Sequence, residues 1–244
     1  MVLKDPRVGP ALRGKVLVLT GSGISAESGI PTFRGPEGYW RKMKPEDLAT
    51  ERAFRRDPAL VWEWYRERRH LVKAAEPNAA HRALAVLGAK AEEFLLVTQN
   101  VDDLHERGGS KEDDLVHIHG RLFVDRCLNG DYETTHLAPS GLPTCPRCGE
   151  LLRPGVVWFE EELNPQNVAR VESFLKGKDC DAVLVIGTTG VFDYIRDWAV
   201  QAAGHQGMLI EVNPNPTELS PLAGTLVRGQ AATVVPELVK AGFE

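Results

Sequence analysis

A glycine-rich turn offers the first candidate chemistry in this sequence. The residues GSGISA (21–26) follow the apolar run KVLVLT (15–20) and fit the pattern G-x-G-x-x-A. Glycines in such a turn let the backbone approach a pyrophosphate closely. The same pattern also serves as a tight strand-to-helix turn that binds no ligand. The positions that would contact a dinucleotide are Gly21, Ser22, Gly23 and Ala26.

The residues after this turn, GIPTFRGPEGYW (29–40), cannot continue a helix. Proline lacks the backbone N–H and clashes with the preceding turn, at a cost of about 3 kcal/mol inside a helix. We therefore expect the helix that starts near Gly23 to end after about two turns, and a long loop to cover the phosphate site. Phe33 and Arg34 lie on this loop, which suggests a lid or a chemical participant.

Two histidines are candidate bases. His117 and His119 lie two residues apart in LVHIHG (115–120), so an extended strand would place both on one face. Imidazole has an ordinary pKa near 6.5 and can accept a proton at neutral pH. The two residues could equally be a metal-ligand pair or satisfied polar residues. Asn100 and Asp102, which follow another apolar run, could also act as helix caps.

A predicted helix over residues 58–75 contains an unusual arginine. Asp57 is its expected N-cap, and Pro58 suits its first turn. Arg68 interrupts the apolar stripe of this helix. Its neighbours three and four residues away are Trp64, Tyr65, Leu71 and Val72. An arginine in such a stripe either extends its charged end to water or awaits an anion.

The cysteines do not form a disulfide framework, because four cysteines are few for a chain of 244 residues. Cys145 and Cys148 form a Cys-x-x-Cys motif, which in a presumed cytosol indicates metal or redox chemistry. Cys180 directly precedes an apolar run and is expected to be a packing residue.

The elements that must position these residues alternate along the chain. Four apolar runs are predicted to be buried strands, at 15–20, 93–98, 182–187 and 208–213. Helical patterns lie at 58–75, 78–88, 164–177 and 192–203. This alternation predicts an α/β fold: a Rossmann-like parallel sheet with helices on both faces. Ligands of such sheets bind beyond the carboxyl ends of the strands, where the glycine turn, residues 98–105 and residues 187–191 should meet.

Two segments break the alternation, residues 36–75 and residues 121–160. We expect them to form a smaller lobe from a helical insertion and a zinc-ribbon-like module. The remaining segments, 1–35, 76–120 and 161–244, would form the Rossmann-like nucleotide-binding domain.

Composition excludes several classes of protein. The net charge of −5 gives no basic field for nucleic acid. The longest apolar runs are far too short to cross a bilayer, so we expect no membrane partner. The first residues lack an apolar segment of signal-peptide length, which favours a cytoplasmic location. The sequence carries no information on oligomeric state.

Seven motifs together resemble those of the sirtuins, which are NAD-dependent protein lysine deacylases. In chain order they are GSGISAESGIPTFRG, TQNVDDLHERGG, HIHG, CPRCG, LLRPGVVWF, GTTG and VNPNP. The resemblance runs from residue 15 to about residue 240. It implies that NAD is consumed as a co-substrate, that acyl-lysine proteins or peptides are the partners, and that nicotinamide and O-acyl-ADP-ribose are the products.

The resemblance also implies roles for individual residues. His119 would be the base for a ribose hydroxyl, with Asn100 and Asp102 as the other catalytic residues. The implied NAD-binding positions are Gly21, Ser22, Gly23, Ala26, Phe33, Arg34, Trp40, Gln99, Asn100, Asp102, Gly187, Thr188, Thr189, Asn213 and Ala231. The implied substrate-binding strand contains Val156, Val157, Trp158 and Phe159. Glu160-Glu161 stands where the family usually has Gly-Glu.

Tyr65 and Arg68 resemble the Tyr-x-x-Arg motif of class III sirtuins, which remove succinyl and malonyl groups. Arginine suits a carboxylate because its planar fork can bond both oxygens. We therefore expect removal of acidic acyl groups in addition to acetyl groups. A second departure from many relatives is Asp193-Tyr194, which replaces a turn that contains proline and alanine.

The family's structural zinc site is incomplete in this sequence. Cys127, Cys145 and Cys148 are in register with three of its four cysteines, and Gly130 stands at the fourth position. Asp131 or His136 could supply the fourth ligand, or the site could be empty.

Three other functions share some of these features. A dehydrogenase would need the long first helix that the sequence interrupts. A non-catalytic reader of ADP-ribose or acyl-lysine would not need a base such as His119. A protein ADP-ribosyltransferase would use the same residues as the deacylase, and the sequence does not separate the two.

Overall fold

The structure is a computed structural model of the chain that describes residues 5–33, 44–130 and 132–243. Its centre is a six-stranded sheet in which every neighbouring pair is parallel. The strand order is β3-β2-β1-β7-β8-β9. The strands are β1 (Lys15–Thr20), β2 (Glu93–Thr98), β3 (Leu115–His117), β7 (Ala182–Ile186), β8 (Met208–Val212) and β9 (Thr225–Val227). The predicted parallel α/β fold is therefore confirmed.

The order of the strands reverses at β1, whose two neighbours are β2 and β7. Thr20 at the end of β1 pairs with Thr98 on one side and with Ile186 on the other. The loops that leave β1 and β7 therefore diverge to opposite faces, which opens a crevice at the carboxyl edge of the sheet.

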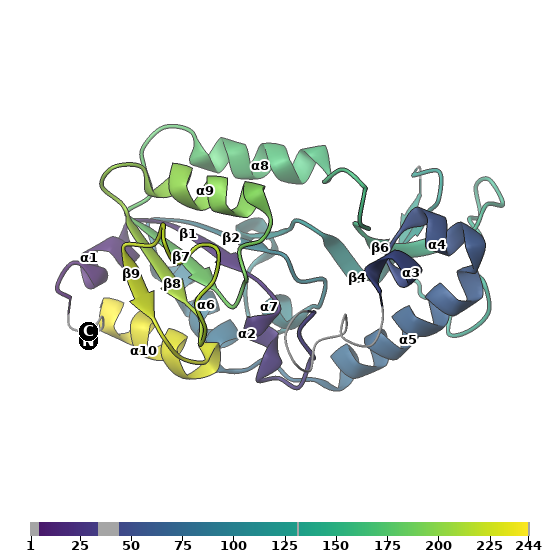
Figure 1. The fold of residues 1–244 in the computed structure, drawn as a ribbon, viewed down its shortest axis with the longest axis horizontal. Coiled ribbons are helices and arrows are strands. Elements are labelled where there is room, and N and C mark those ends of the chain that lie inside the picture. The colour runs from purple at the N-terminus through teal and green to yellow at the C-terminus, as the bar shows by residue number, and fades with distance from the viewer. Residues whose placement is uncertain (1–4, 34–43, 131, 244) are drawn as a thin grey trace.

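Helices cover both faces of this sheet (Figure 1). One face packs against α1 (Val8–Arg13), α6 (Ala79–Lys90) and α10 (Ala231–Phe243). The other face packs against α8 (Pro165–Leu175) and α9 (Asp193–Ala203). Asn78 caps α6 by accepting a hydrogen bond from Ala80 N, as the sequence predicts.

A second hydrophobic core lies at the other end of the molecule (Figure 1). We call it the small lobe. It combines α3 (Pro45–Leu48), α4 (Glu51–Arg56) and α5 (Pro58–Ala74) with the antiparallel strands β4 (Gly120–Cys127), β5 (Glu133–Thr134) and β6 (Leu152–Val156). Phe54, Trp62 and Trp158 are fully buried at its centre. An ion pair between Arg69 of α5 and Asp125 of β4, 2.5 Å long, joins the helices to the strands.

Several predicted elements differ in detail from those in the structure. The helix α2 (Gly23–Ala26) has one turn rather than two. Strand β3 ends at His117, so His119 lies beyond it. Leu71 was expected on the buried stripe of α5 but is 48% exposed, whereas Arg68 is only 6% exposed. A short helix α7 (Leu104–Arg107) and a 3-10 turn η3 (Glu112–Asp114) complete the described elements. Within the described ranges, no helix is both long and apolar enough to cross a bilayer.

Candidate active site

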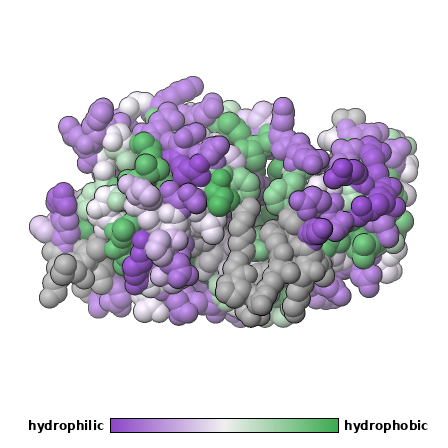
Figure 2. Space-filling model, viewed as in Figure 1, coloured by the Kyte–Doolittle hydropathy of each residue, from purple (hydrophilic) through white to green (hydrophobic). Residues whose placement is uncertain are grey.

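A cavity of about 1180 Å³ lies beyond the carboxyl ends of β1, β2, β7 and β8 and reaches into the small lobe. Hydrophobic side chains gather where the two halves of the molecule meet (Figure 2). The sequence-predicted residues that line the cavity are Gly21, Ser22, Gly23, Ala26, Phe33, Tyr65, Arg68, Gln99, Asn100, His119, Val156, Val157, Trp158, Phe159, Gly187, Thr188, Thr189, Asn213 and Ala231. Arg34 and Trp40 lie outside the described residues.

Two glycine turns touch each other at the base of the cavity. Gly23 N donates to Gly187 O at 2.8 Å, and Gly21 N donates to Ile186 O at 3.0 Å. Gly187 has a φ of +62°, and a Cβ atom there would lie 2.5 Å from Ile24 N. Side chains are therefore excluded at this contact, and the surface offered to a ligand is backbone.

Polar side chains connect the ends of three strands beside these turns. Gln99, after β2, donates through Nε2 to Thr188 Oγ1 at 3.0 Å. Asn213, after β8, donates through Nδ2 to the carbonyl oxygen of Thr188 at 3.0 Å. These amides and hydroxyls form a connected polar wall that suits the hydroxyls of a ribose.

Asn100 belongs to a buried network behind the cavity wall. Its Nδ2 donates to Ser25 Oγ at 3.1 Å, and Ser25 Oγ donates to Asp102 Oδ2 at 3.0 Å. Asp102 is 5% exposed and does not itself line the cavity. Burial raises the pKa of Asp102, while hydrogen bonds from Leu104 N and Ser25 oppose this rise. Asp102 can therefore orient Asn100 through Ser25, for which the sequence predicts no role.

The two candidate histidines occupy different environments. His117 is buried and contacts Glu106 Oε1 through Nε2 at 2.8 Å, outside the cavity lining. His119 lines the cavity, and its Nδ1 lies 2.9 Å from the carbonyl oxygen of Gln99. A carbonyl only accepts, so Nδ1 carries the proton and Nε2 carries the lone pair. Burial lowers the pKa of His119 to about 4, and the Gln99 contact offsets only part of this effect. His119 is therefore a neutral imidazole at pH 7 with Nε2 as its basic atom.

Arg68 lies among aromatic rings at the small-lobe end of the cavity. Its guanidinium carbon is 4.8 Å from the ring centroid of Trp64, 4.9 Å from that of Phe33 and 5.5 Å from that of Tyr65. The hydroxyl of Tyr65 accepts a hydrogen bond from Trp158 Nε1 at 3.0 Å. A positive charge thus lies in an apolar part of the cavity, where it attracts an anion more strongly than it would in water.

Several lining residues were not assigned a role from the sequence. They include Glu27, Thr32, Trp64, Phe192, Tyr194, Asn215 and Gln230, together with residues 160–163. In the sequence, Asp193-Tyr194 stands out only as a departure from a family pattern. No local pattern predicts that the hydroxyl of Tyr194 contacts His119, because the two residues are 75 positions apart.

The three cysteines predicted as metal ligands converge in the small lobe. The sulfurs of Cys127, Cys145 and Cys148 all lie within 4.8 Å of one another, and those of Cys127 and Cys148 are 3.5 Å apart. Three converging thiols fit a site for a thiophilic metal such as zinc. Among the described residues, the group contains no fourth ligand: His136 lies outside it, and Asp131 is not described.

A doubly covered parallel sheet with its cavity at the switch point defines a Rossmann-like α/β protein. The chain belongs to the Sir2 family, whose sequence model matches residues 21–193.

Similar proteins extend this match over nearly the whole chain. The NAD-dependent protein deacylase 1 of Archaeoglobus fulgidus is 44% identical over 229 residues, which cover 92% of this chain and 91% of the relative. The NAD-dependent protein deacylase of Thermococcus kodakarensis is 45% identical over 237 residues, covering 92% and 89%. A solved Sir2 homologue–NAD complex matches with a TM-score of 0.86 and 42% identity, covering 96% of this chain and 91% of that one. A mutant Sir2 homologue bound to ADP ribose matches with a TM-score of 0.89 and 41% identity, covering 98% and 96%.

Proposed function

We propose that this protein is an NAD-dependent protein lysine deacylase. It would transfer acetyl, succinyl and malonyl groups from lysine side chains to ADP-ribose, giving nicotinamide and O-acyl-ADP-ribose. The observation that carries the proposal is the neutral, half-buried His119 in a cavity lined by both glycine turns and the apolar residues Val156 to Phe159. Relatives at 44% and 45% identity named NAD-dependent protein deacylase support the same activity.

The cavity provides distinct parts for the two substrates. The backbone of Gly21, Gly23 and Gly187 suits a pyrophosphate, and Gln99 and Asn213 suit hydroxyl groups. When bound, NAD would supply an electrophilic ribose carbon with nicotinamide as its leaving group, and the acyl-lysine would supply the nucleophilic oxygen. His119 Nε2 would accept the proton of a ribose hydroxyl.

The peptide side of the cavity supports an acyl-lysine substrate. Strand β6 ends at Val156, so Val157, Trp158 and Phe159 follow the strand instead of belonging to it as the sequence predicts. Val157 N donates to His119 O at 2.8 Å, so this segment lies directly beside the proposed base. Residues from Val156 to Phe159 line the cavity and can form the walls of a narrow channel. An extended peptide would pair with this segment through backbone hydrogen bonds.

The acyl preference that we propose rests on Arg68. A charge-assisted, bidentate bond between a guanidinium and a carboxylate is stronger than a neutral hydrogen bond. Succinyl and malonyl groups end in a carboxylate, and acetyl does not. Arg68 lines the same cavity as His119, so a lysine inserted toward the base can present its acyl end to this side chain.

The activity is tested by matched peptides that carry acetyl-, succinyl- or malonyl-lysine, each incubated with NAD. We expect nicotinamide and deacylated peptide in equal amounts, with His119→Ala inactive on all three peptides. A folded protein that releases no nicotinamide with any peptide contradicts the proposal. If radiolabel from NAD accumulates on protein rather than in O-acyl-ADP-ribose, the protein is an ADP-ribosyltransferase instead. Formation of reduced cofactor would indicate a dehydrogenase.

We also propose that the three thiols hold a structural zinc ion, which would join β4 to the segment before β6. Such a site contributes to folding, so Cys148→Ala should lose bound metal and lower the melting temperature of the protein. Elemental analysis should find about one zinc per chain in the wild-type protein. Cys180→Ala is the matched control, because Cys180 packs under the sheet instead. Much less than one zinc in the wild-type protein would contradict this proposal.

The cysteines favour a reducing compartment, and we propose the cytoplasm. All four are free thiols, and three of them gather without forming a disulfide.

A further inference from the structure

Tyr194 contacts the nitrogen of His119 that is free to act as a base. Tyr194 lies in the first turn of α9, and its hydroxyl is hydrogen-bonded to His119 Nε2. Both side chains line the cavity. This contact has no counterpart in the predicted roles of the family motifs, because Tyr194 falls where this sequence departs from them.

The direction of this hydrogen bond follows from the other side of the imidazole ring. Nδ1 of His119 faces the carbonyl oxygen of Gln99 at 2.9 Å and must donate to it. In the neutral ring, Nε2 therefore has no hydrogen, and the phenol of Tyr194 is the donor. Burial raises the pKa of Tyr194, so the phenol keeps its proton throughout the physiological range.

Aromatic neighbours hold Tyr194 in this position. Its ring stacks on Phe192 with centroids 5.7 Å apart and an interplanar angle of 23°. Trp198, one turn along α9, meets the ring edge-on at 5.2 Å. Phe192 also packs against the His119 ring at 5.4 Å. Such pairs favour a defined orientation of the phenol.

We infer that Tyr194 is a positioning residue that holds the Nε2 lone pair of His119 in the free enzyme and releases it to the ribose hydroxyl of the bound substrate. The inference rests on the proposed function, in which His119 is the base. A lone pair accepts one strong hydrogen bond, so the phenol and the substrate hydroxyl compete for the same atom. In the free enzyme, the phenol also fixes the tautomer that leaves Nε2 unprotonated.

The size of this competition can be bounded. A hydrogen bond of ordinary net strength, when it must be broken on binding, reduces apparent affinity by about 2- to 10-fold. Removal of the phenol oxygen alone should therefore tighten NAD binding by that factor. The chemical step should stay nearly unchanged, because Tyr194 has already left Nε2 when the proton moves.

The first experiment examines the free enzyme and needs no catalysis. Diethyl pyrocarbonate transfers its ethoxycarbonyl group to an unprotonated imidazole nitrogen, and ethanol and carbon dioxide leave. We expect Tyr194→Phe to increase the rate of labelling at His119 several-fold, as measured by peptide mass spectrometry. Tyr132→Phe, which removes a phenol oxygen outside the cavity, should not change it. Exposed His70, His136 and His205 serve as internal references. Unchanged labelling of His119 in Tyr194→Phe overturns the inference, whether or not the protein is a deacylase.

The second experiment separates a released contact from a proton relay. Phenylalanine keeps the ring contacts with Phe192 and Trp198, so the variant is expected to fold. For Tyr194→Phe, we expect the KM for NAD to fall about 2- to 10-fold and kcat to stay within about 2-fold. A loss in kcat of tenfold or more, with KM unchanged, would mean that the phenol carries the proton itself and would overturn the inference. An increased KM for NAD would overturn it as well.

Discussion

At the scale of single residues, burial determines the chemistry of His119. Its ring is half-buried, and the imidazolium form loses more stabilisation there than the neutral form does. The carbonyl of Gln99 favours the proton on Nδ1 but does not compensate for the lost hydration, so the pKa falls from 6.5 to about 4. The proposed base would therefore be unprotonated at pH values where an exposed histidine would be charged.

This lowered pKa predicts a pH profile. A base works only when unprotonated, so a pKa of about 4 should keep kcat/KM for NAD level from pH 8 down to about pH 5. The acid limb should then show half-maximal activity near pH 4. Nicotinamide release at constant ionic strength measures this profile, with tryptophan fluorescence as the check that the protein stays folded. A half-maximal point near pH 6.5 would show either that the pKa of His119 is not lowered or that His119 is not the base.

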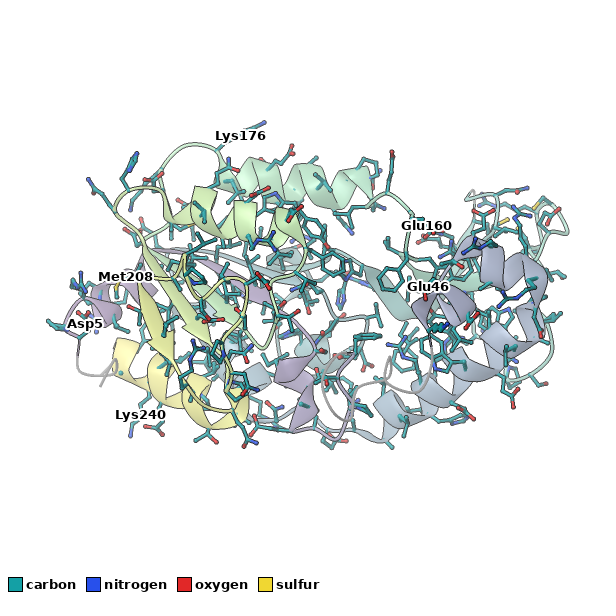
Figure 3. The ribbon with its side chains drawn as sticks, in the orientation of Figure 1. Asp5, Glu46, Glu160, Lys176, Met208 and Lys240 are labelled. Atoms are coloured by element: carbon teal, nitrogen blue, oxygen red, sulfur yellow. The ribbon has the colours of Figure 1, made fainter. Side chains whose placement is uncertain are left out.

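Glu160 has a left-handed backbone conformation that residues with a side chain disfavour. It lies on the connection from β6 to α8 (Figure 3) and has a φ of +72°, the only positive value among the described residues other than glycine. Glu161 N donates to Trp158 O at 3.2 Å, so residues 158–161 form a turn with Glu160 at its third position. A turn with positive φ there favours glycine. The turn therefore has a backbone conformation that suits glycine, which is the residue that the sirtuin resemblance leads us to expect here.

Glu160→Gly should therefore stabilise the protein slightly. Relief of the left-handed conformation contributes about 1–2 kcal/mol, and the greater freedom of glycine in the unfolded chain removes about 0.5–1 kcal/mol. We expect urea denaturation to give a free energy of unfolding higher by up to about 1.5 kcal/mol. Glu162→Gly, in the same connection but without a positive φ, should be neutral or destabilising. A clear loss of stability in Glu160→Gly would argue against strain at this turn.

At the scale of elements, the small lobe depends on the contact between α5 and β4. Arg69 donates through Nε to Leu122 O at 2.8 Å and pairs with Asp125, and both side chains are at most 9% exposed. Burial raises the pKa of Asp125, and the charge of Arg69 opposes this rise. The pair satisfies two groups that would each be costly to bury alone.

Replacing only one residue of the Arg69–Asp125 pair should therefore lower the free energy of unfolding more than replacing both. Arg69→Met leaves Asp125 buried without its cation and should lower the free energy of unfolding by about 3–5 kcal/mol. The double variant Arg69→Met/Asp125→Leu should recover much of this loss. Arg55→Met, which breaks the exposed pair with Glu51, should cost less than about 1 kcal/mol. Urea denaturation measures the free energy of unfolding of all three variants. Equal losses of this free energy in the Arg69 and Arg55 variants would contradict the proposed importance of the buried Arg69–Asp125 pair.

At the scale of the whole molecule, the cavity is shared between two hydrophobic cores. The sheet contributes the glycine turns, Gln99 and Asn213, whereas the small lobe contributes Arg68 and residues 156–159. We propose that this division is the domain boundary, with residues 36–75 and 121–160 as the second domain. Acyl recognition and NAD binding would then depend on different parts of the chain.

Arg68→Met should therefore change acyl preference without changing the use of NAD. Loss of a charge-assisted hydrogen bond should reduce kcat/KM for a succinyl-lysine peptide roughly 10- to 100-fold. The value for the acetyl-lysine peptide should change by less than about 3-fold, and the KM for NAD should stay constant. Arg66→Met, on the same helix but outside this cavity, is the matched control. An equal reduction of kcat/KM for both peptides would refute the proposed role of Arg68.

Local patterns in the sequence predict the scaffold well. The apolar runs at 15–20 and 93–98 coincide with β1 and β2, because residues buried on both faces of a sheet must be continuously apolar. The caps at Asp57 and Asn78 also begin helices as predicted, since each satisfies N–H groups that are close in the sequence.

Contacts between distant segments are what the sequence does not predict. The pairing of Ser25 with Asp102 and of Tyr194 with His119 depends on how separate strands align, and no local pattern records it. Periodicity also misjudged α5: Leu71 faces water, while Arg68 and Arg69 are buried, because the small-lobe strands and aromatic rings provide partners for charge there.

The packing of α1 against the end of α10 has a practical consequence. Arg13 Nε donates to Gly242 O at 2.9 Å, so the first and last helices of the described chain meet at the end of the molecule away from the small lobe (Figure 1). An immobilisation handle fused to either end would emerge on that side. The protein could then be captured on a sensor surface with its small lobe directed away from that surface, and NAD and acylated peptides could be titrated in either order on the same captured sample.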